Sequence, residues 1–411
     1  MNKDIDEKRM SVKILMVLDK AFPTDIRVEK EAISLVKAGY SVGILSIADY
    51  ERNEVINHKG ITVYRIALSK FIADKMHGLA AMIPWIDYYV AKKIIEVLSN
   101  EDYDAIHVHD LYLFGAIRLV RKKVNKWFVG DLHENYVDAL KDYKWSTTYP
   151  NKLIVSISKW ERKEKEWLQY FDRLIVVNEG MKDKNIAKGV PEDKISVVSN
   201  SIDTATFSNY EIDEAIIDRY QDFFTLIYVG GFVSNRGLEH VVKGMATVKE
   251  YNSNIKLLLV GDGEVMNTLQ QLTKQLDLED VIDFEGWQPQ NKIRSYLEAS
   301  NVGLVPFKRT PQTNNSSSNK LYQYMYFGVP VLATNCTSVK KLVDEEQCGI
   351  VYEEESQDQF SEHVIHLFED AKVREKYSKN GREAVKLKYN WEKEAKKLIN
   401  LYGQLEKEQK K

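Results

Sequence analysis

The sequence contains few cysteines, has no long apolar run and carries little net charge. Its two cysteines, Cys336 and Cys348, are too few for a disulfide framework and lack the spacing of a metal site, which favours a reducing compartment. No window approaches the ~18 apolar residues of a membrane-spanning helix, and the charged N-terminus has no apolar core, so neither membrane insertion nor secretion is indicated. We therefore expect a cytoplasmic protein.

The charge balance gives no sign of a nucleic-acid partner. The 58 basic and 61 acidic residues leave a net charge of −3, so the chain lacks the electrostatic footprint of a nucleic-acid-binding surface. One stretch, residues 71–98, combines an apolar helical stripe with lysines and would suit peripheral contact with the inner face of a membrane. A core helix is the commoner explanation of that pattern.

The length of 411 residues and the rhythm of the sequence indicate two domains. Short apolar runs alternate with helical patterns, which is typical of parallel sheets covered by helices on both faces. Ligands bind at the carboxyl ends of the strands in such sheets, so two of them facing each other would leave a central cleft. The predicted strands are 12–18, 41–47, 104–109, 126–131, 173–178 and 195–200, then 224–231, 255–261, 281–286, 301–307 and 329–334.

Glycines follow three predicted strands of the second half and would let a ligand approach the backbone closely. These are Gly230 with Gly231, Gly261, and Gly286. A polar run at 314–318 opens directly into a predicted helix, whose first amides and partial positive charge would suit a phosphate. Arg236 and Lys320 could add positive charge there. Together these features favour a nucleotide pocket, although an ordinary helix cap and βα-turn glycines explain each one singly.

The first half places histidines and acids after two predicted strands, in HVHD (107–110) and DLHE (131–134). Alternation along a strand puts His107 and His109 on one face, so a bound metal is one interpretation. Histidines at strand ends also serve simply as hydrogen-bond partners. His133 alone could act as an acid, a base or a partner of a bound sugar.

With these motifs in place, the chain resembles the retaining, nucleotide-sugar-dependent glycosyltransferases of the GT-B fold, in particular glycosyltransferase family 4. The resemblance rests on the order and spacing of motifs along nearly the whole chain. They are DIRVEKEAISLVKAGYSV, DLHEN, VVSNSIDTATF, YVGGFVSNRGL, LLLVGDGE, FEGWQP, NKLYQYMYFGVPVLAT and YNWEKEAKKLINLYGQL.

The resemblance implies an α/β protein of GT-B architecture, with two doubly wound Rossmann-like domains facing a central cleft. Residues 1–203 would bind the acceptor, residues 204–388 the donor nucleotide sugar, and residues 389–411 would pack back on the first domain. It implies a nucleotide-sugar co-substrate, a glycan, lipid-linked or small-molecule acceptor, and no metal or other cofactor.

Roles for individual residues follow from the same resemblance. His133 would lie near the transferred sugar, with Asn315 also at the sugar, and Asp25 and Arg27 would belong to a loop on the acceptor side. The expected donor-binding residues are Gly230, Gly231, Arg236, Gly261, Gly286, Trp287, Asn319, Lys320, Leu321 and Gln323.

The chain departs from the family pattern at three of these positions. Asn315 and Gln323 stand where two glutamates are common, and amides keep hydrogen bonding but lose the negative charge. Gly231 stands where an arginine is usual, so one phosphate partner would be missing, and Lys320 could compensate. Two alternatives therefore stay open: a metal-dependent hydrolase using the histidine motifs, and a binding partner with a degraded donor site.

Overall fold

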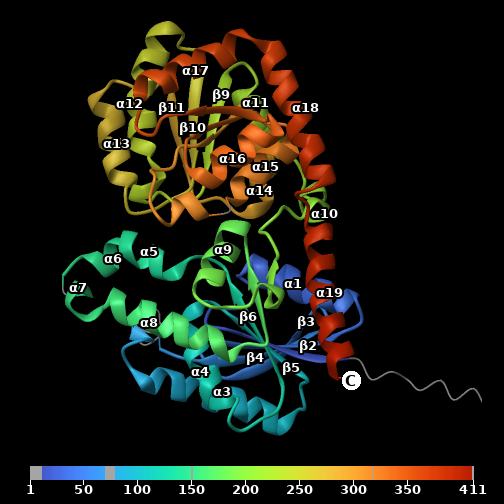
Figure 1. Cartoon of the computed structure of the whole chain (residues 1–411). Coiled ribbons are helices and arrows are strands. Elements are labelled where there is room, and N and C mark those ends of the chain that lie inside the picture. Colours follow the sequence, from blue (N-terminus) through green and yellow to red (C-terminus); the bar gives the residue numbers. More distant parts are fainter. Residues whose placement is uncertain (1–11, 70–78, 150, 317, 410–411) are drawn as a thin grey trace, which may run out of the picture. The chain divides into compact units, whose positions relative to one another are not determined.

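The computed structural model describes residues 12–69, 79–149, 151–316 and 318–409, and the charged N-terminal segment lies outside these ranges. The chain divides into two compact units (Figure 1). The first unit comprises Met1–Val198 and Ala395–Lys411, and the second comprises Ser199–Glu394. The expected boundaries at 203 and 388 differ from these limits at Val198 and Glu394.

The first unit is built on an eight-stranded sheet of order β3-β4-β2-β1-β5-β6-β7-β8. All neighbours pair in parallel except β3 and β4, which are antiparallel. The strands are β1 (Lys13–Leu18), β2 (Ser41–Ala48), β3 (Glu54–His58), β4 (Ile61–Ala67), β5 (Ala105–His109), β6 (Trp127–Leu132), β7 (Arg173–Val176) and β8 (Ile195–Val197).

Helices cover this sheet and bury apolar stripes against it. In α1 (Ile26–Lys37), Val28, Ala32 and Leu35 recur at helical spacing and are fully buried, and the Asp25 side chain caps the helix start. The other helices are α3 (Pro84–Asn100), η1 (Leu111–Leu113), α4 (Phe114–Val120), α5 (Tyr136–Asp142), α6 (Lys144–Thr147), α7 (Asn151–Ile154), α8 (Ile157–Trp167), η2 (Leu168–Tyr170), α9 (Glu179–Ala187) and η3 (Glu192–Lys194).

The second unit contains a six-stranded, all-parallel sheet of order β11-β10-β9-β12-β13-β14. The strand order reverses between β9 and β12, which is where doubly wound sheets open a crevice for a ligand. The strands are β9 (Phe224–Val229), β10 (Ile255–Val260), β11 (Ile282–Gly286), β12 (Val302–Val305), β13 (Val331–Thr334) and β14 (Gly349–Tyr352).

The remaining helices pack around this second sheet, and the last one continues into the first unit. They are α10 (Thr204–Ser208), α11 (Glu214–Tyr220), η4 (Ser234–Arg236), α12 (Leu238–Tyr251), α13 (Met266–Gln275), α14 (Gln290–Glu298), η5 (Thr313–Asn315), α15 (Asn319–Phe327), α16 (Thr337–Glu346), α17 (Gln357–Glu369), α18 (Ala371–Leu387) and α19 (Trp391–Gln409).

The predicted pair of Rossmann-like domains is confirmed, but three strands were not predicted. The hairpin of β3 and β4 turns at Lys59 and Gly60, which both have positive φ. Of the apolar stretch at 71–98, residues 71–78 lie outside the described residues, and residues 84–98 belong to α3, with Ile86, Val90 and Ile94 in the core. Both cysteines are buried and unbridged. Among the described residues, no helix combines the length and apolarity needed to cross a bilayer.

Candidate functional site

Glycines lie at the carboxyl ends of β9, β10 and β11, on one edge of the second sheet, which we call the glycine edge: Gly230, Gly231, Gly261 and Gly286. Gly230 and Gly261 adopt φ angles of +133° and +148°, which other residues rarely adopt. A Cβ on Gly261 would lie 2.0 Å from the carbonyl oxygen of Gly230. The glycines therefore allow the carboxyl ends of β9 and β10 to approach each other closely. Their backbone is not covered by side chains of their own.

Two cations approach this edge over aromatic rings, one of which they share. The Arg236 guanidinium lies 4.4 Å from the centre of the Phe307 ring, and the Lys320 ammonium lies 5.0 Å from that ring and 4.1 Å from the Tyr228 ring. Lys320 also reaches across Gly230, where an added Cβ would lie 3.1 Å from its Nζ. Within the described part of the chain, no carboxylate forms an ion pair with Arg236 or Lys320.

The pKa of Lys320 reflects the absence of a paired carboxylate among the described residues. Burial lowers its pKa well below the ordinary value for lysine, and the neighbouring Arg236 lowers it further. An anion placed beside both side chains would favour the protonated ammonium and reverse this effect. The arrangement is therefore suited to an anionic ligand.

The helix α15 begins at Asn319, beside these cations. Its N-cap residue Ser318 makes no capping bond through its side chain to the described residues. The preceding loop is held in place, because Asn314 accepts from the Thr337 amide at 3.1 Å and Asn315 donates to the Pro311 carbonyl at 2.9 Å. The first amides of α15 thus form a fixed, electropositive helix start.

The remaining predicted donor residues occupy different environments. Leu321 is buried in the core, whereas Gln323 is half-buried and Asn319 is exposed. Trp287 follows β11 and is 73% exposed. The adjacent Glu285 holds that strand end through hydrogen bonds from Tyr220 and Tyr296, both 2.6 Å long.

In the first unit, the carboxyl ends of β5 and β6 bring together a second group of polar side chains, which we call the histidine cluster: His107, His109, Asp131 and His133. Asp131 Oδ2 lies 3.4 Å from His109 Nδ1 and 3.3 Å from His133 Nε2. His107 and His109 stack with ring centres 4.4 Å apart. Both are fully buried, and burial lowers both pKa values, that of His109 to about 3, so these two imidazoles are neutral.

Arg27 supplies the positive charge that balances this cluster. Its Nη2 lies 3.1 Å from Asp131 Oδ1 and 3.0 Å from Glu31 Oε1, and its Nη1 donates to the Val198 carbonyl at 3.1 Å. The expected acceptor-side loop is thus the start of α1, where Asp25 caps the helix and Arg27 is buried. Arg27 acts in this unit by holding Asp131.

His133 is the least buried member of the cluster and carries a charge. Burial opposes protonation, but the carboxylates of Asp110 and Asp131 outweigh it and raise the His133 pKa to about 9. Asp110 itself accepts from the Tyr112 hydroxyl at 2.8 Å and lies 3.5 Å from Lys20 Nζ. Below pH 9, His133 is therefore an imidazolium with a fixed orientation.

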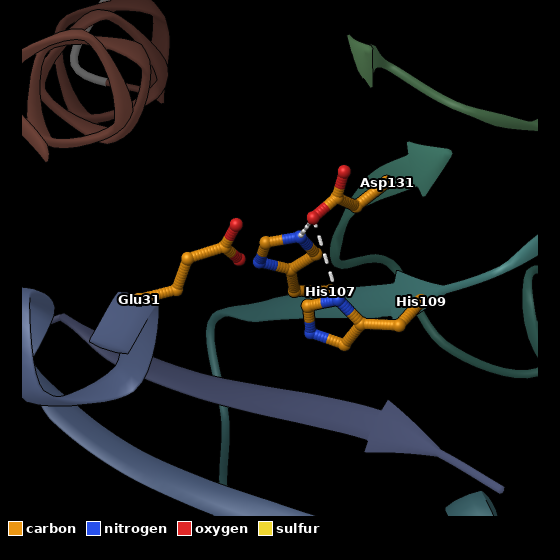
Figure 2. Close-up of side chains that lie close together, drawn as sticks. All are labelled: Glu31, His107, His109 and Asp131. Atoms are coloured by element: carbon orange, nitrogen blue, oxygen red, sulfur yellow. Dashed lines mark ion pairs between the residues drawn. The ribbon is translucent and has the colours of Figure 1, made fainter. Parts of the chain in front are cut away.

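Four side chains here could in principle ligate a metal ion. Glu31, His107, His109 and Asp131 are buried and offer atoms that all lie within 4.8 Å of one another (Figure 2). The Arg27 guanidinium, however, already lies against both carboxylates, and burial raises the Glu31 pKa to about 8, which keeps it protonated and neutral. Glu31 Oε2, His107 Nε2 and His109 Nε2 are buried without a hydrogen-bond partner in the described part of the chain, as a metal site would require. A metal would nevertheless have to displace a buried cation, so the cluster fits an ion-paired network better than a metal centre.

Sequence reasoning missed three residues in or beside the histidine cluster. Glu31 lies one helical turn after Arg27, a spacing that could have indicated a pair. The Tyr402 hydroxyl, in α19, shares a hydrogen bond of 3.0 Å with His107 Nδ1, although the two residues are 295 positions apart in the sequence. Lys20 follows β1 and pairs with Asp25 at 3.2 Å.

Two family models match the chain in sequence. The model described as Glycosyltransferase Family 4 matches residues 28–206, and the one described as Glycosyl transferases group 1 matches residues 209–384. An uncharacterised glycosyltransferase of Methanocaldococcus jannaschii is 22% identical over 397 residues, covering 90% of this chain and 91% of that protein.

Solved structures of glycosyltransferases share the fold. The sucrose-phosphate synthase of Thermosynechococcus elongatus superposes with a TM-score of 0.75 at 18% identity, covering 96% of this chain and 99% of that one. Anabaena HepE, solved in complex with UDP, gives a TM-score of 0.69 at 13% identity, covering 96% and 100%. The two-domain architecture of this chain is therefore that of the GT-B fold.

Proposed function

Because the chain belongs to the glycosyltransferases of family 4 and group 1, we propose that it transfers a sugar from a nucleoside-diphosphate sugar to a glycan, lipid-linked or small-molecule acceptor. The second unit binds the donor, the first unit binds the acceptor, and the anomeric configuration is retained. The proposal rests mainly on Arg236 and Lys320, two cations that converge on the glycine edge with no carboxylate paired to them among the described residues.

The diphosphate is the ligand that fits this edge. Departure of a nucleoside diphosphate develops negative charge at its terminal phosphate, and preorganised donors are most effective where charge develops. Arg236, Lys320 and the amides at the start of α15 supply such donors, and no metal is required in this proposal. The bare backbone at Gly230 and Gly261 allows the phosphates to approach.

Other side chains orient the rest of the donor. Gln323 binds the ribose, Asn315 binds the transferred sugar, and the backbone at Gly286 and Trp287 lies near the base. His133, on the first unit, donates a hydrogen bond to the sugar. HepE has been solved with UDP and with UDP-glucose, which makes uridine nucleotides the first donors to test.

Donor binding can be tested by calorimetry and thermal unfolding with a panel of nucleotides and nucleotide sugars, each with and without EDTA. We expect a base-selective stabilisation that survives EDTA, of about 2.7 kcal/mol at a hundredfold excess over the dissociation constant. Arg236→Ala and Lys320→Ala should each weaken binding by roughly ten-fold to a hundred-fold, since hydrogen bonds to charged groups contribute about 1.5–3 kcal/mol.

A nearby lysine provides the matched control. Lys308 lies in the same unit but already pairs with Glu355 at 2.9 Å, so Lys308→Ala should leave donor affinity unchanged. Unchanged affinity in Arg236→Ala would remove that residue from the site. Donor binding without turnover on any acceptor would instead favour a binding partner, the reading that Asn315 and Gln323 left open.

A further inference from the structure

Three small polar side chains are fully buried at the carboxyl edge of the second sheet, and we call them the threonine cluster: Thr313, Thr334 and Cys336. Thr334 ends β13, Cys336 lies just before α16, and Thr313 begins η5. Burial of a hydroxyl is unfavourable unless the hydroxyl forms hydrogen bonds. The partners of these side chains therefore show what the cluster holds in place.

The threonine cluster holds the backbone that follows β12. The Thr334 hydroxyl donates to the Phe307 carbonyl at 2.5 Å, and the Thr313 hydroxyl donates to the Lys308 carbonyl at 2.5 Å. The Cys336 Sγ lies 3.5 Å and 3.6 Å from the same two carbonyl oxygens. A thiol has one hydrogen, donates it weakly and cannot serve both carbonyls at once. The two hydroxyls are therefore the main anchors of this backbone.

The anchored backbone carries the aromatic ring that both cations share. Phe307 is buried, and its ring centre lies 4.4 Å from the Arg236 guanidinium and 5.0 Å from the Lys320 ammonium. The next residue, Lys308, donates its amide to the Asn235 carbonyl at 3.0 Å, directly before Arg236. A shift of the backbone at Phe307 would therefore move the ring and the backbone next to Arg236 together.

The cluster also fixes the loop that leads towards the start of α15. The Thr313 hydroxyl, besides its bond to Lys308, accepts from the Thr310 amide at 2.8 Å. Thr313 opens the single turn η5, which ends at Asn315. The proposed function puts the Asn315 side chain at the transferred sugar. The hydrogen bonds of Thr313 thus determine where the turn that carries Asn315 lies.

We propose that Thr334 and Thr313 are positioning residues for the nucleotide-sugar donor, an inference that rests on the proposed function. Thr334 places the Phe307 ring, and with it both cations, at the diphosphate. Thr313 places the turn of Asn315 at the sugar. Both side chains are fully buried, so they act through backbone carbonyls and not by contact with the donor. Loss of one hydroxyl should affect the phosphate part of donor binding, and loss of the other the sugar part.

Calorimetry of the full chain, below the unfolding temperature of every variant, tests this with UDP, UDP-glucose, GDP and GDP-mannose as ligands. Thr334→Val keeps the shape of the side chain but removes the hydroxyl. We expect it to weaken the nucleoside diphosphate and its sugar derivative alike, by about ten-fold. Thr313→Val should weaken the nucleotide sugar about five-fold more than the nucleotide. Thr334→Ser and Thr313→Ser keep the hydroxyl and should bind within about three-fold of the parent.

Thr225 provides a control with the same chemistry at the opposite edge of the sheet. It is fully buried and its hydroxyl donates to the Ala299 carbonyl at 2.5 Å, but it lies at the start of β9. Thr225→Val should lower the melting temperature as Thr334→Val does, yet leave donor affinity unchanged. An equal loss of affinity in these two variants would show that the hydroxyls have a merely structural role and would overturn the inference.

A further variant keeps the test decisive if Thr334→Val does not fold. Phe307→Leu removes the shared ring but keeps the backbone carbonyl, and it should weaken the nucleotide as Thr334→Val does; unchanged affinity would overturn the inference. Parent-like affinity in Thr334→Val and Thr313→Val, with a parent that binds one of the ligands, would overturn the inference alone. A parent that binds none of the four ligands would overturn the proposed function and the inference together.

Discussion

Both units place charged side chains at the carboxyl ends of parallel strands, but only one set is balanced. In the first unit, each of three cations already has a carboxylate partner: Lys20 pairs with Asp25, Arg27 with Asp131, and His133 with Asp110. At the glycine edge of the second unit, Arg236 and Lys320 face aromatic rings and each other. The first set is satisfied internally, and the second needs an anion from outside.

This difference separates a scaffold from a binding site. A buried charge with its partner in place holds neighbouring groups in position. A buried lysine without a partner has a lowered pKa, and a bound anion would raise that pKa again. Titratable groups with shifted pKa values occur in both units, so the shift alone does not mark the ligand site. The distinguishing observation is whether the opposite charge is already present.

The largest effect is expected when a cation is removed from the paired charges of the first unit. Arg27→Leu leaves the Asp131 carboxylate buried without its cation, and we expect a loss of about 3–5 kcal/mol in the free energy of unfolding of that unit. Denaturant unfolding followed by tryptophan fluorescence measures it, because five of the seven tryptophans lie in the first unit. Lys126→Ala, which breaks the exposed pair with Asp102, is the control and should cost under about 1 kcal/mol. A comparable loss in both variants would show that the network is not a scaffold.

His133 tests whether a residue of the paired set can also act on the substrate. It pairs with carboxylates of the first unit, and we propose that it also donates a hydrogen bond to the sugar. His133→Ala should reduce transfer by about 10²-fold and leave nucleotide binding nearly intact. Since Asp110 and Asp131 raise the His133 pKa to about 9, transfer that needs the imidazolium should fall as the pH rises through 9. Asp110→Asn should move that fall to lower pH. Equal kinetics in the His133 variant and the parent would exclude the role.

The smallest expected effect concerns Glu31 and pH. Because burial raises the Glu31 pKa to about 8, above that of an unfolded carboxyl, the folded state holds an extra proton between about pH 4.5 and 8. The free energy of unfolding should therefore fall as the pH rises across this window. Glu31→Gln should flatten that fall, while Glu161→Gln, at an exposed pair, should not. Parallel pH curves for Glu31→Gln and the parent would contradict the assignment.

The sequence allowed most of the fold to be predicted, since the buried strands of parallel sheets are nearly continuous apolar runs such as Lys13–Leu18 and Ile255–Val260. The hairpin of β3 and β4 was not predicted, because residues of β3 alternate between half-buried and exposed, which weakens the apolar pattern of that strand. Its turn at Lys59 and Gly60 was the available clue.

The candidate site was less accessible to sequence reasoning. Arg236 and Lys320 could be named because each follows a strand end or opens a helix. The rings that bring both cations to one place are Tyr228, in β9, and Phe307, just after β12, and the pairing of these two strands is not visible in sequence. Likewise, the residues of the contact between Tyr402 and His107 are 295 positions apart in the sequence. Residues that are distant in the sequence but adjacent in the fold leave no local sequence pattern from which their contact could be predicted.

That last contact has a consequence for how the protein is made. The side chains of Leu398, Leu401, Tyr402 and Leu405 are buried, and this segment belongs to the first unit, although the ribosome synthesises it after the second unit. The second unit, Ser199–Glu394, is continuous in sequence and can complete its core earlier. We therefore expect the unit translated second to reach its native packing first, and the N-terminal unit to remain open to chaperones until α19 has been synthesised.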